Sequence, residues 1–252
     1  MFPFFTILGR EIPTFGLMGI IGVAIATYLA SFRAKRYNLE RTDVVYIAAF
    51  AGVGLLLGSM IMFTLTRIPM LWRMRELVST DLWRWLRMGF GGMVFYGGLF
   101  GAIIALWLYA KRMKIPFGNL ILLTVPVFPL AHAFMRVGCF LGGCCYGIFH
   151  ETLGVVFPRL GAPHLPVQLY ESFANLIIFA VIWTFTIKER HWITVVSFYG
   201  LMYSVVRFVL EYFRGDVARG AALWFSTSQW ISIAVFAVCI YGLIYKNKRA
   251  DL

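Results

Sequence analysis

The stretch VVYIAAFAGVGLLLGSMIMFTLT, residues 44–66, is apolar almost throughout and contains no Asp, Glu, Lys or Arg. An α-helix needs about 20 such residues to cross the hydrocarbon core of a membrane. Six further runs without these charged residues extend over 12–32, 88–110, 115–135, 172–187, 192–206 and 220–245. The seven runs predict an all-α, polytopic integral membrane protein with about seven transmembrane helices. No soluble segment is evident, so we expect residues 1–252 to form a single transmembrane domain.

The composition of the whole chain indicates the same class of protein. Of its 252 residues, 61% are hydrophobic and 13% are charged, and the mean hydropathy is +0.80. Soluble domains are about 45–50% apolar and about 25% charged, whereas disordered chains are poor in apolar and aromatic residues. The composition therefore excludes a soluble enzyme and a disordered chain, and the presence of only four cysteines excludes a disulfide scaffold.

Lysine and arginine are distributed unequally between the segments that join the runs. If the N-terminus lies outside, all six lysines fall in cytoplasmic segments and the outer side carries arginine only. Cytoplasmic loops are enriched in Lys and Arg, but the combined counts are nearly even here, 12 inside and 11 outside. The segregation of lysine therefore predicts an outer N-terminus and a cytoplasmic C-terminus. The lysines are Lys35, Lys111, Lys114, Lys188, Lys246 and Lys248.

The charge of the chain indicates which partners to expect. The net charge of +12 at pH 7 suits a protein that lies against anionic lipids. Because this charge is scattered between the apolar runs, we expect membrane lipids as partners and no nucleic acid. An outer side with arginine and no lysine favours lipid phosphate, which guanidinium groups bind with paired hydrogen bonds. The alternative is that these arginines only extend toward the headgroups.

Several charged residues fall at membrane depth. The fifth and sixth runs have only 16 and 15 residues, and they reach spanning length only if Glu171 and Arg207 lie in the membrane. Arg136 lies between two uncharged stretches, and Glu211 and Arg214 follow Arg207 at i+4 and i+7, on one predicted helix face. Charged groups at this depth are usually paired or functional. Three arginines and two acids leave one positive charge, which a lipid phosphate would balance; salt bridges that only stabilise the bundle are the alternative.

The segment HAFMRVGCFLGGCCYG, residues 132–147, combines four glycines with three cysteines. Glycine-rich, irregular backbone at membrane depth lines cavities, and small residues four apart also permit close helix packing. The cysteines follow the spacing C-x4-C-C rather than the C-x2-C of common zinc sites. Free cysteine behaves as a small hydrophobic residue, so we expect these three to pack, and we predict no metal ligand and no cofactor. Metal or redox chemistry with the flanking His132 and His150 is the alternative.

Six motifs occur in the same order as in one family of membrane enzymes. Arg136–Gly147 resembles the signature Gly-Arg-x-Gly-Asn-Phe-x-Asn-Gly-Glu-x-x-Gly, and Tyr203–Arg214 resembles Tyr-Gly-x-x-Arg-Phe-x-x-Glu-x-x-Arg. The chain thus resembles the prolipoprotein diacylglyceryl transferase family over most of its length. The other four motifs are Pro13–Leu17, Gly91–Gly101, Pro166–Glu171 and Ser228–Ser232.

This resemblance implies a transferase in the bacterial inner membrane, with its active site toward the outer leaflet. The implied donor is phosphatidylglycerol, and the acceptor is the thiol of a cysteine in a lipoprotein-precursor peptide. Arg136 and Arg207 match family arginines that would hold the lipid phosphate, and Tyr96 matches a catalytic position that often carries His. Among the matched residues, Glu211 and Arg214 would orient the two arginines. The residues that the resemblance assigns to substrate binding are Phe15, Gly138, Cys139, Cys144, Gly147, Gln168, Tyr170, Glu171, Glu211 and Arg214.

The sequence departs from the family pattern at several polar positions. A thiol acceptor needs a base, and Tyr96 is a weak one because a phenol titrates near pH 10. Two alternatives follow: a divergent paralogue that transfers a lipid group to another acceptor, and a membrane module that binds lipid or metal without catalysis. The substituted positions are Phe15 for Tyr, Tyr96 for His, Met135 for Gly, Cys139 and Gly142 for the two Asn, and Cys144 for Glu.

Overall fold

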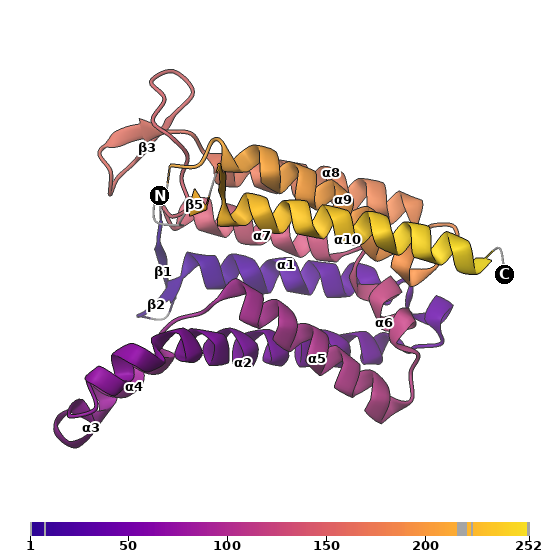
Figure 1. The fold of residues 1–252 in the computed structure, drawn as a ribbon, viewed down its shortest axis with the longest axis horizontal. Coiled ribbons are helices and arrows are strands. Elements are labelled where there is room, and N and C mark those ends of the chain that lie inside the picture. Colours follow the sequence, from indigo (N-terminus) through magenta and orange to yellow (C-terminus); the bar gives the residue numbers. More distant parts are fainter. Residues whose placement is uncertain (1, 8, 216–220, 223, 251–252) are drawn as a thin grey trace. The chain divides into compact units, whose positions relative to one another are not determined.

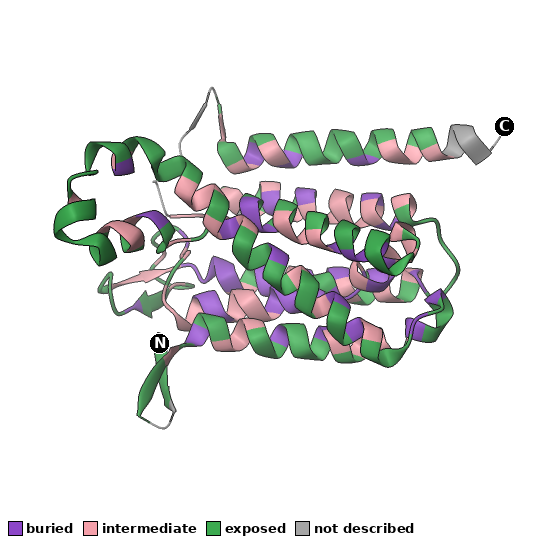
Figure 2. Cartoon of the chain, turned by 90° about the horizontal axis from the view of Figure 1, so that it is seen from below, coloured by how far each residue is buried: buried purple, intermediate pink, exposed green. Residues whose placement is uncertain are grey.

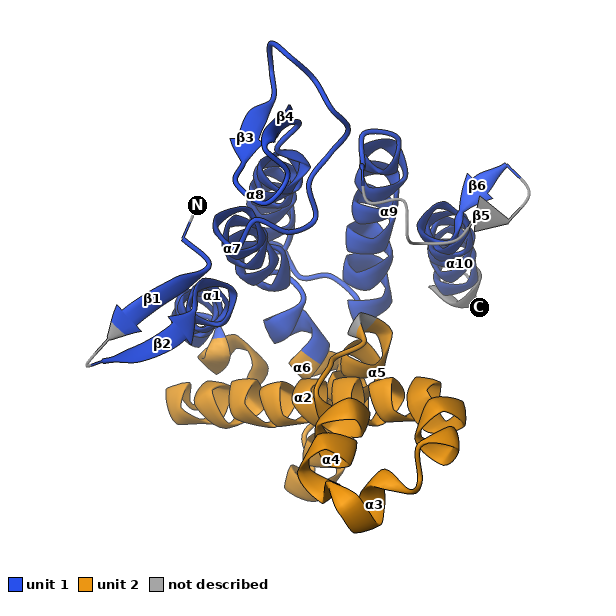
Figure 3. Ribbon diagram, turned by 90° about the vertical axis from the view of Figure 1, so that its left-hand side faces the viewer, with its two compact units in different colours: residues 1–33, 121–252 blue, residues 34–120 orange. Residues whose placement is uncertain are grey.

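The computed structural model describes residues 2–7, 9–215, 221–222 and 224–250, most of which are helical (Figure 1). Contacts divide the chain into two compact units, which Figure 3 colours separately. Unit 1 comprises residues 1–33 and 121–252, and unit 2 comprises residues 34–120. A single transmembrane domain over the whole chain therefore stays a prediction.

Unit 1 is built from helices that pack in a series. α1 packs against α7, α7 against α8, α8 against α9, and α9 against α10 (Figure 1). Ile178 and Ile182 of α8 and Val195 of α9 are buried together between their helices. Pro166 directly precedes α8 and Pro129 lies in the first turn of α7, where the missing N–H of proline costs no helical hydrogen bond. The helices are α1 (Thr14–Ser31), α7 (Phe128–Leu141), α8 (Val167–Phe185), α9 (Trp192–Glu211) and α10 (Thr227–Ala250).

Three antiparallel hairpins supplement these helices, so the fold is mostly rather than entirely helical. Each hairpin has two strands of at most four residues, and all three belong to unit 1. The first two form where Gly, Pro and polar residues lie between the apolar runs, because such residues favour turns, whereas the strands of the third lie within the predicted run 220–245. Their strands are β1 (Phe4–Ile7) with β2 (Arg10–Pro13), β3 (Val155–Phe157) with β4 (Ala162–His164), and β5 (Ala221–Ala222) with β6 (Phe225–Ser226).

Unit 2 is organised around the close approach of its two long helices. A Cβ on Gly58 of α2 would collide with the carbonyl oxygen of Gly97 on α5, and one on Gly101 would collide with that of Gly54. Small residues four apart thus let the two backbones touch, so part of the Gly91–Gly101 motif has a packing role. The elements are η1 (Ala34–Tyr37), α2 (Arg41–Arg73), α3 (Leu77–Thr80), α4 (Leu82–Phe90) and α5 (Phe95–Met113); α6 (Phe117–Thr124) crosses the boundary between the units.

The helices confirm a multi-pass membrane protein but not the number of spans. Among the described residues, five helices are long and apolar enough to cross a membrane: α1, α2, α8, α9 and α10. α6 and α7 together make a sixth candidate that is bent by 47°. The predicted run 88–110 is instead divided between α4 and α5, because the backbone at 91–94 leaves the helical conformation. Seven spans and the orientation of both termini stay predictions.

Large apolar side chains are exposed on the helices, as expected where lipid replaces water. Figure 2 shows exposed residues along the helices of the chain. Ile20 on α1 is 70% exposed, Val53 on α2 56% and Val238 on α10 68%. A soluble protein would bury such side chains, because burial of apolar surface is the main favourable term in its folding.

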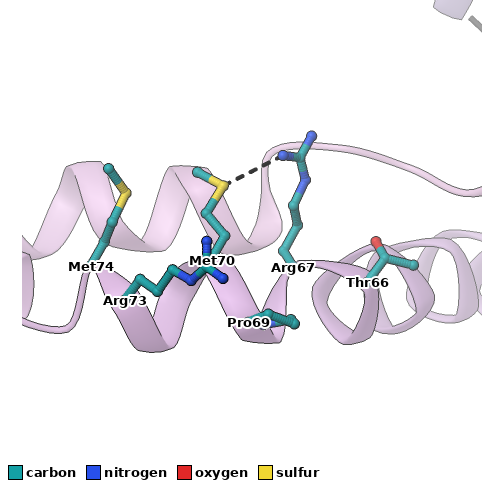
Figure 4. A pocket seen from close by; sticks show the side chains of 6 residues that line it. All are labelled: Thr66, Arg67, Pro69, Met70, Arg73 and Met74. Carbon is teal, nitrogen blue, oxygen red and sulfur yellow. Dashed lines mark hydrogen bonds between the residues drawn. The ribbon is translucent and has the colours of Figure 1, made fainter.

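Unit 2 also has a surface hollow near the end of α2 (Figure 4). Arg67 and Met70 point toward each other there, and the guanidinium donates to the Met70 sulfur at 3.5 Å. Because the lining residues come from α2 and its C-cap residue Met74, the hollow is a groove on a helix surface, and its lining includes none of the buried charges of unit 1. It is lined by Thr66, Arg67, Pro69, Met70, Arg73 and Met74.

Candidate active site

The carboxylate of Glu171 is the centre of the buried polar cluster in unit 1. Glu171 lies in the second turn of α8 and is 1% exposed. Its Oε1 lies 3.0 Å from Nη2 of Arg136 and accepts a hydrogen bond from the Tyr203 hydroxyl at 3.0 Å. His132 Nε2 lies 3.8 Å from the same oxygen, and Arg207 Nη1 lies 3.9 Å from Oε2. Glu171 thus joins α7 and α9 through charged and polar side chains.

A second ion pair extends the cluster along α9. Nη2 of Arg207 lies 2.7 Å from Oε2 of Glu211, one helical turn further on. Glu211 also accepts a hydrogen bond from the Ser226 hydroxyl at 2.9 Å, and Arg207 donates to Ser228 Oγ at 3.1 Å. The start of α10 is therefore tied to the end of α9 by polar contacts.

The start of α10 is itself fixed by a reciprocal pair of hydrogen bonds. The Gln229 backbone donates to the Ser226 hydroxyl oxygen at 3.2 Å, and the Ser226 backbone donates to Oε1 of Gln229 at 3.0 Å. This Ser-x-x-Gln arrangement is a capping box, which satisfies two backbone donors that a helix start leaves unpaired. The box holds Ser226 and Ser228 beside Glu211 and Arg207.

Helical spacing explains why these side chains converge. His132 and Arg136 are four residues apart on α7, and Tyr203, Arg207 and Glu211 are successive fourth residues on α9. Residues four apart lie one above the other on the same helix face. Each helix therefore presents a polar row, and α8 supplies Glu171 between the rows.

Two guanidinium donors in the cluster have no hydrogen-bond partner among the described residues. They are Nε of Arg136 and Nη1 of Arg207, and both atoms are buried. Buried N–H groups are almost always hydrogen-bonded in native structures, so these donors indicate a position for an additional acceptor. Phosphate oxygens suit it, because they accept hydrogen bonds from guanidinium groups with favourable charge and geometry. These donors are where a phosphate group would be held, beside the carboxylate oxygens Glu171 Oε2 and Glu211 Oε2, which also have no hydrogen-bond partner among the described residues.

Arg214 does not extend the row on α9, which corrects the predicted i, i+4, i+7 face. The helix ends at Glu211. The backbone N–H groups of the next three residues donate hydrogen bonds to carbonyl oxygens three rather than four residues earlier in the chain. Arg214 then forms an isolated antiparallel bridge with Gly147. The ion pairs described above join two arginines, Arg136 and Arg207, to two carboxylates, Glu171 and Glu211.

The glycine-rich segment after Arg136 packs at close quarters in unit 1. A Cβ on Gly138 would lie 3.1 Å from the Phe15 Cα, so glycine lets α7 approach α1. A Cβ on Gly147 would lie 2.6 Å from the Phe213 carbonyl oxygen. The buried Gln168 donates from Nε2 to the Cys144 carbonyl oxygen at 2.5 Å. Several residues assigned to substrate binding therefore have packing or hydrogen-bonding contacts within this segment. They are Phe15, Gly138, Cys144, Gly147 and Gln168.

Two further residues assigned from the resemblance are exposed at the surface of their own unit. Tyr170 precedes Glu171 but is 40% exposed. Tyr96 is the second residue of α5 in unit 2, also 40% exposed, and its catalytic role stays a prediction. Conversely, His132, Tyr203 and Ser226 contact the cluster although their sequence positions alone did not assign them to the site. Their four-residue spacing from Arg136 and Arg207, and the Ser-x-x-Gln pattern, were the available signals.

Comparison with known proteins shows the family to which the chain belongs. The sequence profile of a family described as prolipoprotein diacylglyceryl transferase matches residues 3–245. The chain belongs to this family. A phosphatidylglycerol–prolipoprotein diacylglyceryl transferase of Clostridium tetani is 32% identical, with 94% of each chain covered. A protein of the same name from Coxiella burnetii is 31% identical, and the match covers 93% of this chain and 92% of the relative. Another from Chlorobaculum tepidum is also 31% identical, and the match covers 98% of this chain and 90% of the relative.

Proposed function

We propose that this transferase moves a diacylglyceryl group from phosphatidylglycerol to the thiol of a cysteine in a lipoprotein precursor. The names of its relatives support both substrates, and the buried donors of Arg136 and Arg207 support a phosphate-containing lipid. The proposal includes a place in the bacterial inner membrane, with the active site toward the outer leaflet.

The proposed reaction is a substitution at carbon. The thiolate sulfur forms a bond to the glyceryl carbon of phosphatidylglycerol, the bond from that carbon to the phosphate oxygen breaks, and glycerol phosphate leaves with the electron pair. Negative charge therefore grows on the leaving phosphate. Fixed cations in a site without water stabilise such charge strongly, because they need no reorganisation when it develops.

The cluster suggests a division of roles among its residues. Arg136 and Arg207 would hold the phosphate through the donors that lack a partner. Glu171 would fix the orientation of both, since it lies 3.0 Å from Arg136 and 3.9 Å from Arg207. Glu211 would position Arg207 from the other side. The remaining assignments, Tyr96 included, stay proposals that rest on the resemblance.

The test measures transfer of label from phosphatidylglycerol to a peptide with a lipoprotein-type cysteine, using protein purified in detergent. We expect Arg136→Gln and Arg207→Gln each to lower the rate about a hundredfold or more, as removal of one transition-state donor does elsewhere. Arg67→Gln in the groove of α2 is the matched control and should transfer at the wild-type rate. Wild-type rates in both site variants would refute the assigned roles.

A divergent acceptor is the second candidate, and the cysteines in the signature segment favour it. Cys139 is buried and Cys144 exposed at positions where the resembling family carries Asn and Glu. The same assay separates the two candidates. Binding of phosphatidylglycerol without transfer to the peptide would favour another acceptor, whereas replacement of the standard enzyme in cells would exclude it.

A further inference from the structure

The end of α7 brings two cysteines together through a helix-terminating motif. The Cys144 backbone N–H donates to the Cys139 carbonyl at 3.1 Å, and that of Gly143 donates to Phe140 at 3.1 Å. Gly143 has a φ of +72°. This pair of bonds around a left-handed glycine is the Schellman motif, in which the side chains at the positions of Cys139 and Cys144 face each other. The Cys144 thiol also donates to the Cys139 carbonyl oxygen at 3.6 Å.

A second left-handed residue adds the third cysteine. Cys145 has a φ of +62°, a conformation that side-chain-bearing residues adopt uncommonly and that concentrates at functional sites. As a result, the three sulfur atoms of Cys139, Cys144 and Cys145 lie within 4.8 Å of one another. Thiolates in a tetrahedral zinc site lie about 2.3 Å from the metal, hence about 3.8 Å apart. A closure of about 1 Å would therefore create a three-sulfur site.

Two positive side chains act electrostatically on this group. They are Arg214 and Arg136, whose charges both act on Cys145. Thiolate is the form of cysteine that binds metals. Two arginines also offset part of the charge that three thiolates would bring.

The segment that carries the cysteines is held by several hydrogen bonds. Gln168 donates to the Cys144 carbonyl, and the Gly147 backbone donates to the Leu165 carbonyl at 2.8 Å. Gly147 also pairs with Arg214 across the isolated bridge. The thiols thus project from a segment anchored to α8 and to the end of α9, and metal binding would need little ordering of the chain.

We propose that Cys139, Cys144 and Cys145 bind one zinc ion as thiolates, and that its fourth coordination position takes the acceptor thiol. The second half of this proposal rests on the proposed transfer to a cysteine. Three protein ligands and an open position are the arrangement of catalytic rather than structural zinc sites. Arg136 lies one turn before Cys139 on α7 and interacts electrostatically with Cys139 and Cys145, so the phosphate-binding group and the metal are neighbours.

Cys139, Cys144 and Cys145 would hold the zinc ion, which would supply the ionisation that the acceptor thiol needs. A thiol that coordinates zinc would lose its proton, here to water, and become a thiolate. Its sulfur then forms the bond to the glyceryl carbon while the phosphate leaves with the electron pair of the broken carbon–oxygen bond. The thioether product carries no negative charge and binds zinc weakly, so it can leave.

The first experiment measures metal binding without any turnover. The full-length protein is purified in detergent, loaded with zinc and freed of excess ion, and its metal content is measured; cobalt is then substituted to detect sulfur-to-metal charge-transfer absorption. We expect one zinc per chain, cobalt–thiolate absorption, and loss of both in Cys139→Ser, Cys144→Ser and Cys145→Ser. Cys239→Ala, which removes the buried cysteine of α10, is the matched control and should retain both.

Two results of this experiment would overturn the site. One is wild-type protein that holds far less than one metal ion per chain after loading, or serine variants that hold as much as the wild type. The other is a disulfide within the trio in metal-free protein purified without reductant, seen as two titratable thiols fewer than after reduction. Because wild-type metal content is measured directly, poor folding of a variant cannot mimic either result.

The second experiment tests the open position with the cobalt-loaded protein. A peptide with the acceptor cysteine should intensify the charge-transfer absorption, because it adds a fourth sulfur, and the same peptide with serine should not. Identical spectra with both peptides would overturn the acceptor role. Neither spectrum depends on phosphatidylglycerol, so a failure of lipid transfer is distinguished from a failure of the metal site.

Discussion

At the scale of single residues, contacts from two neighbouring helices meet at the carboxylate of Glu171. Arg136 and His132 approach it from α7, and Tyr203 and Arg207 approach it from α9. Arg136 needs this carboxylate, because an isolated charge that is removed from water is costly, whereas Arg207 also has Glu211. Glu171 therefore has a structural as well as an orienting role, and the two are separable by measurement.

We expect Glu171→Gln to destabilise the protein and to lower transfer. The variant keeps the shape of the side chain but leaves the buried guanidinium of Arg136 without its carboxylate, which costs about 3–5 kcal/mol when a buried pair is broken. Arg207 loses only its longer contact and keeps Glu211 at 2.7 Å. Thermal unfolding in detergent measures the stability, and transfer is measured where the variant is still folded. A melting temperature and rate equal to those of the wild type would contradict this account of Glu171.

Tyr96 is a separate question, since it belongs to unit 2. If its hydroxyl takes part in proton transfer, Tyr96→Phe should lower the transfer rate about a hundredfold or more. Tyr28→Phe on α1, which is 64% exposed, serves as the control for loss of a tyrosine hydroxyl. An unchanged rate in Tyr96→Phe would remove this residue from catalysis, as expected where zinc ionises the acceptor thiol.

At the scale of elements, the polar rows of α7 and α9 are positioned by the segments at their ends. α7 ends in the Schellman motif, and α9 ends at Glu211 before the bridge between Gly147 and Arg214. α10 begins in the capping box of Ser226 and Gln229. The helix ends therefore determine which side chains reach the cluster and which do not.

Gly147 is a position where this arrangement leaves no room for a side chain. A Cβ there would lie 2.6 Å from both the Phe213 carbonyl oxygen and Val167 Cγ2, so Gly147→Ala should cost about 1–3 kcal/mol of stability, as overpacking does elsewhere. Gly52→Ala on α2, where a Cβ meets nothing within 4 Å, is the matched control and should not be destabilised. Equal unfolding temperatures for the two variants would show that the segment moves freely.

At the scale of the whole molecule, the distribution of lysine makes a prediction about orientation. With all six lysines in cytoplasmic segments, the C-terminus should lie in the cytoplasm. A green fluorescent protein fused after Leu252 should then fluoresce, and alkaline phosphatase fused there should be inactive, because it needs an oxidising compartment. The reverse pattern would invert the topology and place the cluster on the other side of the membrane.

The sequence by itself determined the membrane class, the family and most of the buried charges. Apolar runs report directly on the lipid environment, and Arg136, Glu171 and Arg207 were recognisable because a charge within such a run is rare. Glu171 and Arg207 do lie inside helices of spanning length. These features depend only on which residues lie next to one another in the chain, so they can be read directly from the sequence.

Only the tertiary structure decided which of these residues meet. The end of α9 at Glu211 separates Arg214 from the row that its spacing predicted, since a helix stops where backbone hydrogen bonds find other partners. The break at 91–94 divides a run that was continuous in composition. The spacing C-x4-C-C indicated packing, yet two left-handed residues fold it into a cluster of three sulfurs. Such convergence depends on backbone turns and contacts between segments distant in sequence, which no local pattern contains.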